Sequence, residues 1–158
     1  MAGFKEFSSQ VQRYVQLRQR AAKGLHEPKK SASPESIAKY QRDLATRIRR
    51  ARPNAREGEI FTPVTVNAFR DVIAAEFKSP AASHARATIL EGEPIKNVRI
   101  EVNEIYPAAL PYTSVPPTLL ERLPRLPEEV AYRIVDRDLV LLDVKANLVV
   151  DVLTNALP

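Results

Sequence analysis

Four aspartates in the last part of the chain are the residues best placed to do chemistry. Asp136 and Asp138 share a predicted turn, and their carboxylate oxygens are weak candidates for a hard cation such as calcium. Turn chemistry is the simpler interpretation, because an Asp side chain stabilises a turn by bonding to its own backbone. Together with Asp143 and Asp151 they also leave open a carboxylate-based hydrolase, although the spacing singles out no acid pair.

The other residue types argue against most reaction centres. The chain has no cysteine, so it has no thiol nucleophile and no thiolate metal site. One of its two histidines is in a predicted linker, and the other, His84, neighbours Ser83 on a predicted helix, where the two side chains do not face each other. The four glycines are isolated, so no phosphate loop is present. We therefore assign no catalytic residue, expect no cofactor, and favour a protein that is not an enzyme.

The basic residues are concentrated at the start of the chain. Residues 1–56 carry 14 Lys and Arg against 4 acidic residues, a formal charge of +10, whereas residues 57–158 carry 10 against 15, which is −5. Such asymmetry indicates either an anionic partner or two halves that attract each other within one fold, and the second interpretation is the simpler. The candidate anion-binding residues are Arg13, Arg20, Lys23, Arg42, Arg49, Arg50 and Arg52.

Two amphipathic helices are predicted to carry these basic side chains. Apolar residues from Phe4 to Leu25 recur at spacings of three and four, and Gly24 provides a left-handed cap near the end. After a polar connector, Ser33-Pro34 supplies the N-cap and first residue of a second helix, which Pro53 ends. Two helices joined in this way predict a helical hairpin with antiparallel packing.

The same signal of a capping residue followed by proline occurs twice more. Thr62-Pro63 begins a helix that extends to about Phe77, and Ser79-Pro80 begins a shorter helix over residues 81–90, closed by Gly92. These two segments form a second helical pair.

The rest of the chain is predicted to be rich in β-structure. Alternating apolar residues at 98–102 predict one strand, and apolar runs at 132–135, 139–142 and 148–153, separated by turns, predict three more. Six prolines in residues 107–127 keep that segment out of a sheet interior, apart from one or two helical turns near 118–123. The prediction is an antiparallel meander of three or four strands.

These elements predict an α+β fold in a single domain over residues 1–158. The helical part covers about residues 4–92 and the β-rich part about 95–158. The strand runs are apolar on both faces, so we expect helices to cover one side of the sheet. No apolar run approaches the roughly 18 residues of a membrane span.

Three residues have two competing interpretations. Arg18 lies within the first apolar stripe and is expected to run its stem over the apolar surface, with an ion pair to another element as the alternative. Tyr106 and Tyr112 lie in the proline-rich segment, where we expect them to fasten it to the core. The alternative is that they present a rigid apolar surface to a partner.

Three parts of the sequence resemble a family of uncharacterised exported bacterial proteins. They are residues 132–151, with the pattern YRxVxxDLVLxD…ANLxVD, residues 51–63 and residues 110–117. The resemblance implies a periplasmic or secreted protein, and it implies no activity and no catalytic residue. Met1-Ala2-Gly3 leads straight into the first helix with no apolar leader, so a cytoplasmic protein is the alternative.

The leading hypothesis from the sequence is a non-enzymatic binding or interaction module of the bacterial cell envelope or exterior, with a protein partner. A second hypothesis is an anion-binding protein that contacts nucleic acid or anionic lipid through the basic helical hairpin. Nucleic-acid readers usually interleave glycine or aromatic residues with the basic ones, and this sequence does not. The carboxylate-based hydrolase is the third.

Overall fold

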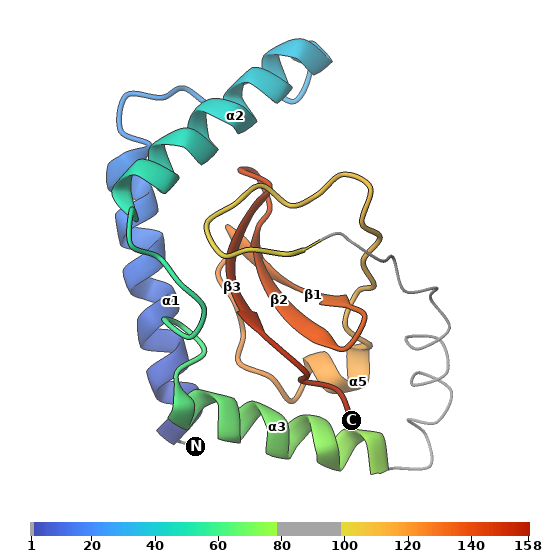
Figure 1. Ribbon diagram of the computed structural model, residues 1–158. Helices are drawn as coiled ribbons and strands as arrows, with labels where there is room; N and C mark the ends of the chain where they lie inside the picture. Colours follow the sequence, from blue (N-terminus) through green and yellow to red (C-terminus); the bar gives the residue numbers. More distant parts are fainter. Residues whose placement is uncertain (1, 79–98) are drawn as a thin grey trace.

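The computed structural model describes residues 2–78 and 99–158. Within them, helices occupy the N-terminal half and a three-stranded antiparallel sheet follows near the C-terminus, so the α+β prediction is confirmed. Helices α1 and α3 border the sheet, whereas α2 leads away from it (Figure 1). The predicted helix at 81–90, with His84, lies outside the described residues.

Helix α1 covers Ala2–Ala21 and α2 covers Pro34–Ala51. The predicted start of α2 is confirmed, because Ser33 is its N-cap and accepts a hydrogen bond from the Ser36 N–H at 3.2 Å. Gly24 has φ +84°, as a left-handed turn after α1 requires. Both helix boundaries therefore follow from local capping chemistry.

The two helices of the predicted hairpin contact each other, and α2 buries its apolar stripe more deeply toward its end. In α2, Leu44 and Ile48 are fully buried, but Ile37, earlier in the same stripe, is 44% exposed. The second half of α2 is buried most deeply, Tyr40 packs partly buried against the same apolar cluster, and the start of the helix projects (Figure 1). The connector of residues 22–33 is long enough to lead the chain away before α2 returns across α1.

Helix α3 covers Pro63–Lys78 and packs directly against the start of α1. The two backbones approach closely at Gly3, where an added Cβ would lie 2.7 Å from the Val64 carbonyl oxygen and 2.8 Å from the Ala68 Cβ. The Thr65 hydroxyl donates to the Gly3 carbonyl at 3.0 Å across this contact. A glycine is therefore needed at this position.

The sheet consists of β1 (Val130–Val135), β2 (Asp138–Asp143) and β3 (Leu148–Leu153) in that order. The turns between them use left-handed residues, Asp136 with φ +56° and Asn147 with φ +52°. The meander and its turns agree with the prediction from sequence.

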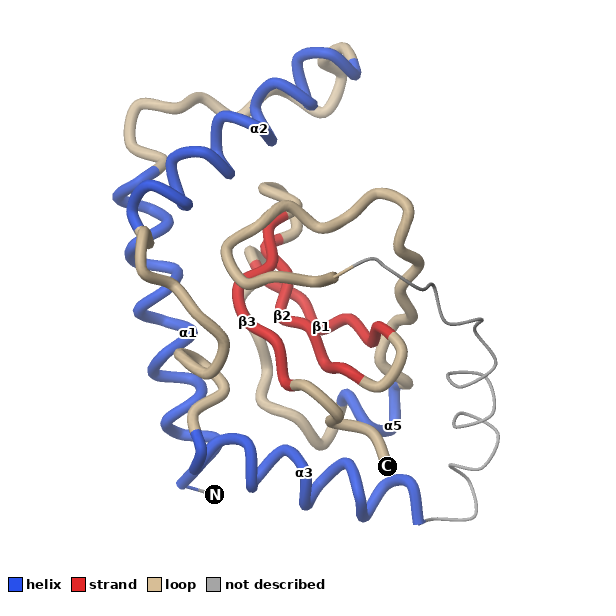
Figure 2. Tube along the Cα trace, in the orientation of Figure 1, coloured by secondary structure: helices blue, strands red, loops and turns tan. Residues whose placement is uncertain are grey.

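Each face of the sheet packs against a different part of the chain. Phe7, Phe69 and Tyr132 belong to the larger apolar cluster, which joins α1, α2 and α3 to one face. Tyr106 and Leu110 pack on the opposite face against Val140, in a smaller cluster. Helices therefore cover one face, as expected, and irregular chain covers the other (Figure 2).

The strand predicted at residues 98–102 is not confirmed. Val98 lies outside the described residues, and residues 99–102 have no strand structure. Asn103 then turns with φ +66°, and only from there does the chain bond to β3, through Asn103 N–H to the Val149 carbonyl at 2.8 Å. Ile100 and Val102 pack against the smaller cluster without forming a ladder.

The proline-rich segment is irregular except for one helical turn, α5, at Pro117–Leu120. This agrees with the turn predicted within residues 118–123.

Candidate anion-binding surface

A buried polar centre joins α1 to the sheet. Asp143 is completely buried at the end of β2 and accepts hydrogen bonds from the Tyr14 hydroxyl and the Arg18 Nε–H, both at 2.6 Å. The ion pair corrects the expectation that Arg18 runs over the apolar surface. Its partner lies 125 residues away in the sequence, so no local pattern indicates it.

The titration of this centre follows from its burial. Burial, followed by the charge of Asp143, raises the pKa of Tyr14 well above its usual value. Burial lowers the pKa of Arg18, but the hydrogen bond to Asp143 and the charge of that carboxylate raise it overall. Tyr14 thus remains a neutral donor and Arg18 a cation, and both serve to satisfy Asp143.

A second buried carboxylate, that of Asp151, holds the loop before α3. It accepts backbone N–H bonds from Gly58, Ile60 and Phe61 at 3.0, 2.8 and 2.8 Å. Burial raises the pKa of Asp151, against the opposing effect of these bonds. Asp143 and Asp151, possible catalytic acids by sequence, are therefore each bonded separately within the fold.

The hairpin acids are arranged differently. Asp136 is exposed in the turn, whereas Asp138 accepts a hydrogen bond from the Asn155 N–H at 2.8 Å. Burial raises the pKa of Asp138, opposed by that bond. Among residues 2–78 and 99–158, no three His, Asp or Glu side chains gather as a metal site would require.

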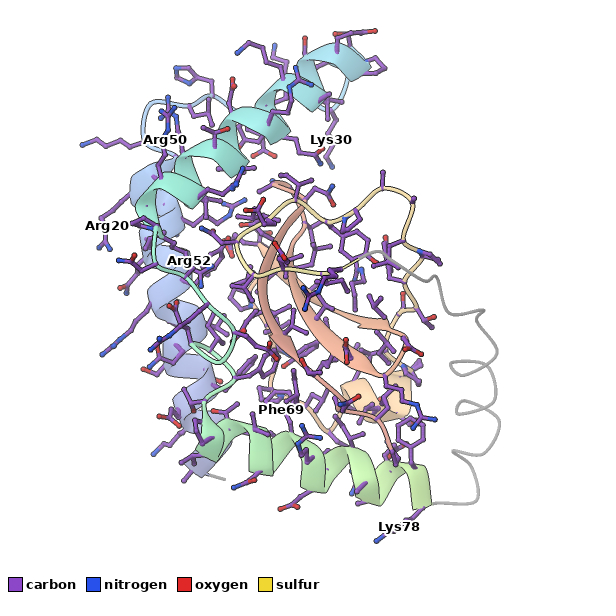
Figure 3. All side chains as sticks on the ribbon, viewed as in Figure 1. Arg20, Lys30, Arg50, Arg52, Phe69 and Lys78 are labelled. Carbon is purple, nitrogen blue, oxygen red and sulfur yellow. The ribbon has the colours of Figure 1, made fainter. Side chains whose placement is uncertain are left out.

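Five of the predicted anion-binding residues are exposed on or beside α1 and α2, and we call these five the basic face. Each is without an ion pair to any described residue. Arg20 and Arg50 lie on the same outer side where the two helices meet (Figure 3). Arg49 differs, because it pairs with Glu104 at 2.9 Å. The basic face consists of Arg13, Arg20, Lys23, Arg42 and Arg50.

Arg52 is the exception among the predicted residues, because it is only 9% exposed. Its guanidinium lies 5.2 Å from the centre of the Tyr14 ring and donates to the Val150 carbonyl at 3.3 and 3.4 Å. Its carboxylate partner is Glu59, at 3.3 Å. Arg52 therefore joins α2 to β3, on the inner side of the basic face (Figure 3).

A pocket of about 320 Å³ lies between α1 and residues 51–60. Arg13 and Gln10 line it from α1, and Arg52 and Glu59 line it from the other side. Arg13, Leu17 and Arg20 share one face of α1 by their spacing, so the pocket is continuous with the basic face. The sequence does not predict this pocket. Arg13, Arg52 and Glu59 come together only in the tertiary fold, and no spacing in the sequence links Glu59 to the two arginines.

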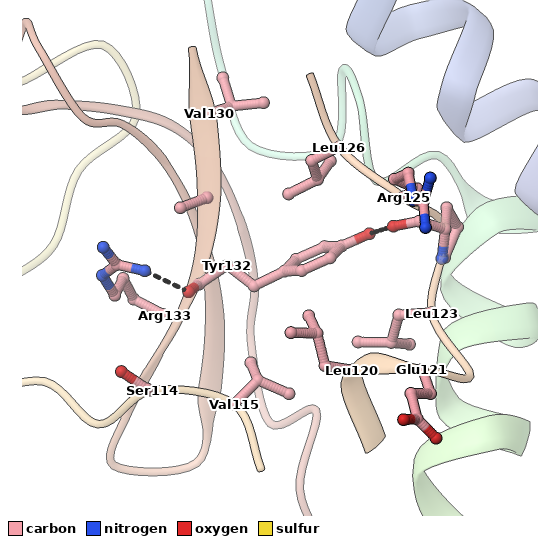
Figure 4. Close-up of a pocket in the computed structure, with 12 residues that line it drawn as sticks. Ser114, Val115, Leu120, Glu121, Leu123, Arg125, Leu126, Val130, Tyr132 and Arg133 are labelled. Atoms are coloured by element: carbon pink, nitrogen blue, oxygen red, sulfur yellow. Dashed lines mark hydrogen bonds between the residues drawn. The ribbon is translucent and has the colours of Figure 1, made fainter. Parts of the chain in front are cut away.

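A second cavity, of about 670 Å³, lies between β1 and the α5 region. Its walls are mainly apolar, with Leu123, Leu126 and Val130 around the Tyr132 ring (Figure 4). The Tyr132 hydroxyl is not free for chemistry, because it donates to the Pro124 carbonyl at 2.8 Å. Such walls can accept an apolar group, and the charged residues Glu121, Arg125 and Arg133 also line the cavity.

The two tyrosines of the proline-rich segment behave differently from each other. Tyr106 is buried and fastens this segment to the sheet, as expected, and burial raises the pKa of its hydroxyl to about 12. Tyr112 stays at the surface at 49% exposure, with the Arg133 guanidinium 5.0 Å from its ring centre.

No family model matches the chain, and neither the curated proteins nor the solved structures contain a match to it. None of the helices in the described part of the chain combines the length and apolar character needed to cross a bilayer.

Proposed function

We propose that the protein is a non-enzymatic binding module of the bacterial cell envelope or exterior, and that its basic face contacts an anionic phospholipid surface. The observation that supports this most strongly is the set of exposed basic side chains on two helices, none paired with an acid among the described residues. A cation near an anionic membrane gains about 1 kcal/mol per Lys or Arg.

The use of the buried ionisable groups favours binding over catalysis. Tyr14, Arg18 and Asp143 bond to one another, and Asp151 bonds to backbone N–H groups. Groups held in this way stabilise the fold, whereas catalysis requires acids and bases that face a substrate.

The resemblance to exported proteins favours a lipid surface over nucleic acid as the partner. The basic residues are also not interleaved with the glycines and aromatic side chains that usually accompany nucleic-acid recognition. A membrane surface requires only a suitable charge, because its attraction for basic residues is electrostatic.

Binding to phospholipid vesicles tests this proposal. The full chain should bind vesicles that contain phosphatidylglycerol at about 50 mM salt, and binding should weaken as the salt approaches about 1 M, where the Debye length is only about 3 Å. Vesicles of phosphatidylcholine alone should not bind. The double variant Arg20→Glu and Arg50→Glu should bind at least about tenfold more weakly.

A matched control keeps the total charge change the same. Arg125→Glu with Arg137→Glu reverses two exposed arginines outside the basic face and should bind vesicles as the unaltered protein does. If phosphatidylglycerol vesicles fail to bind at low salt, or if both double variants lose binding equally, the proposal is wrong. Binding to duplex DNA but not to vesicles would replace it with the nucleic-acid hypothesis.

A further inference from the structure

We propose that the pocket between α1 and residues 51–60 binds a single phosphate group, held between Arg13 and Arg52. This inference rests on the binding function proposed above and specifies its ligand chemistry. The phosphate can belong to a lipid headgroup or be free, since the recognising groups are the same. The pocket, about 320 Å³ in volume, is near the lower end of the roughly 300–1,000 Å³ range of small-ligand sites.

The first reason is the weak internal bonding of Arg52. This buried guanidinium makes only long bonds, 3.3 and 3.4 Å to the Val150 carbonyl and 3.3 Å to Glu59. Arg18, the other buried arginine of this region, is bonded to Asp143 at 2.6 Å. Charge-assisted bonds normally measure about 2.7–2.9 Å, so Arg52 is under-coordinated and favours a closer anion.

The second reason is the nature of the acid that Arg52 now contacts. The Glu59 side chain is 40% exposed and lies on the pocket wall. An exposed carboxylate at this distance is easily displaced, because water competes with Arg52 for the carboxylate. Glu59 therefore acts as an internal counter-ion that an entering phosphate replaces.

The third reason is the group opposite Arg52. Arg13 is exposed, lines the same pocket and has no ion pair among the described residues. Gln10, one turn earlier on α1, and Asn54 add amide donors to the lining. Two planar guanidinium groups with amide donors suit the several oxygens of a phosphate.

The position of Arg52 is fixed before any ligand arrives. The Tyr14 ring lies under its guanidinium at 5.2 Å, and Tyr14 is itself held by Asp143. This arrangement reduces the ordering cost of binding, because the cation is already oriented. The pocket thus has one buried arginine held by its contacts and one exposed arginine at the surface.

Titration of inorganic phosphate into the full chain at low ionic strength tests the proposal. Isothermal calorimetry gives the affinity, and NMR spectra show whether the signals of Gln10 and Arg13 shift. Arg13→Ala should weaken phosphate binding about tenfold, the loss expected for one charge-assisted contact. Glu59→Gln should strengthen it about threefold or more, because the competing carboxylate is removed.

Both variants change surface positions and leave the buried Arg52 intact, but general charge attraction would also move them in opposite directions. The comparison that distinguishes a site is therefore with an arginine removed elsewhere on the surface. Arg137→Ala, an exposed arginine outside the pocket, is the control and should bind phosphate normally. Phosphate that fails to bind, or binds equally to Arg13→Ala, overturns the pocket. A lower affinity for phosphate in Glu59→Gln would also contradict the pocket proposal.

Two further results separate this inference from the proposed function. If vesicles bind but free phosphate neither binds nor competes, the pocket proposal fails and the membrane-binding function stands. If phosphate binds in the pocket but vesicles of phosphatidylglycerol do not bind, the pocket stands as a site for a free phosphate compound and the lipid function fails.

Discussion

The carboxylate of Asp143 accepts bonds from Tyr14, Arg18 and the Ala146 N–H while fully buried. An ion enclosed in this way is tolerated only when its lone pairs are satisfied, because its desolvation is costly. The three donors come from α1 and from the turn after β2, so a single side chain orients α1 on the sheet.

Removing one charged partner of this buried centre should destabilise the fold more than removing both charges. Arg18→Met leaves Asp143 as an uncompensated buried charge and should lower the free energy of unfolding by about 3–5 kcal/mol. The double variant Arg18→Met with Asp143→Leu should recover part of that loss. Urea denaturation measures both, with Arg20→Met, at the surface, as the control. Equal losses in the single and double variants would contradict this account.

The residue scale is also where sequence-based prediction was weakest. The helical stripe correctly indicated that Tyr14 and Arg18 face inward, but not what they contact. Their acceptor lies in a strand 129 and 125 positions away, and pairing at that distance depends on the tertiary fold. For the same reason Arg52 appeared as one more surface cation, although it is buried against β3.

At the scale of elements, an irregularity in β3 explains how the loop before α3 is held. The pairing of β2 with β3 shifts between Leu141 and Leu142, because Leu141 faces Asp151 and Leu142 faces Val149. Val150 is thus an extra residue, and such a bulge turns two successive side chains to the same side. Val150 belongs to the cluster on the helix side, and Asp151 bonds to the loop on that side.

Weakening the hydrogen bonds from the loop to Asp151 should make the loop before α3 more mobile before it affects the helices. Asp151→Asn replaces an acceptor of three loop N–H groups by an amide with one acceptor oxygen, and should cost about 1–3 kcal/mol. Amide hydrogen exchange should accelerate most at Gly58, Ile60 and Phe61. Asp136→Asn, in the exposed turn, is the matched control. Unchanged exchange at these three amides in Asp151→Asn would show that the carboxylate does not hold the loop.

Elements were predicted well where a local signal defines them. Ser33-Pro34 and Thr62-Pro63 mark the starts of α2 and α3, because capping and proline geometry operate within one helical turn. Alternation at 98–102 failed within the described residues, since Ile100 and Val102 bury their side chains without a partner strand. The Asp151 bulge left no pattern in the sequence.

At the scale of the whole molecule, three buried tyrosines link stability to alkaline pH. Burial raises the pKa of Tyr106 to about 12, and it also raises the pKa of Tyr14 and the pKa of Tyr132. In the unfolded chain each phenol ionises near pH 10. Above pH 10 the unfolded state therefore loses protons that the folded state retains, and the equilibrium shifts toward unfolding.

The free energy of unfolding should accordingly be independent of these groups below pH 10 and fall above it, by up to about 1.4 kcal/mol per pH unit for each phenol. Urea midpoints measured from pH 8 to pH 11 test this. Tyr132→Phe loses a hydrogen bond to Pro124, so it should be less stable at pH 8 yet show a shallower decline. An identical decline in the variant would contradict the assignment.

The contacts between α1 and the sheet have a consequence for synthesis of the protein. Phe7 stacks near Tyr132, and Tyr14 bonds to Asp143, so the first helix leaves the ribosome long before its partners are translated. Until then α1 can pack only on α2 and α3, and the part of its apolar stripe that faces the sheet stays exposed, as a surface that chaperones recognise. Native structure must form late and cooperatively, once β2 and β3 emerge.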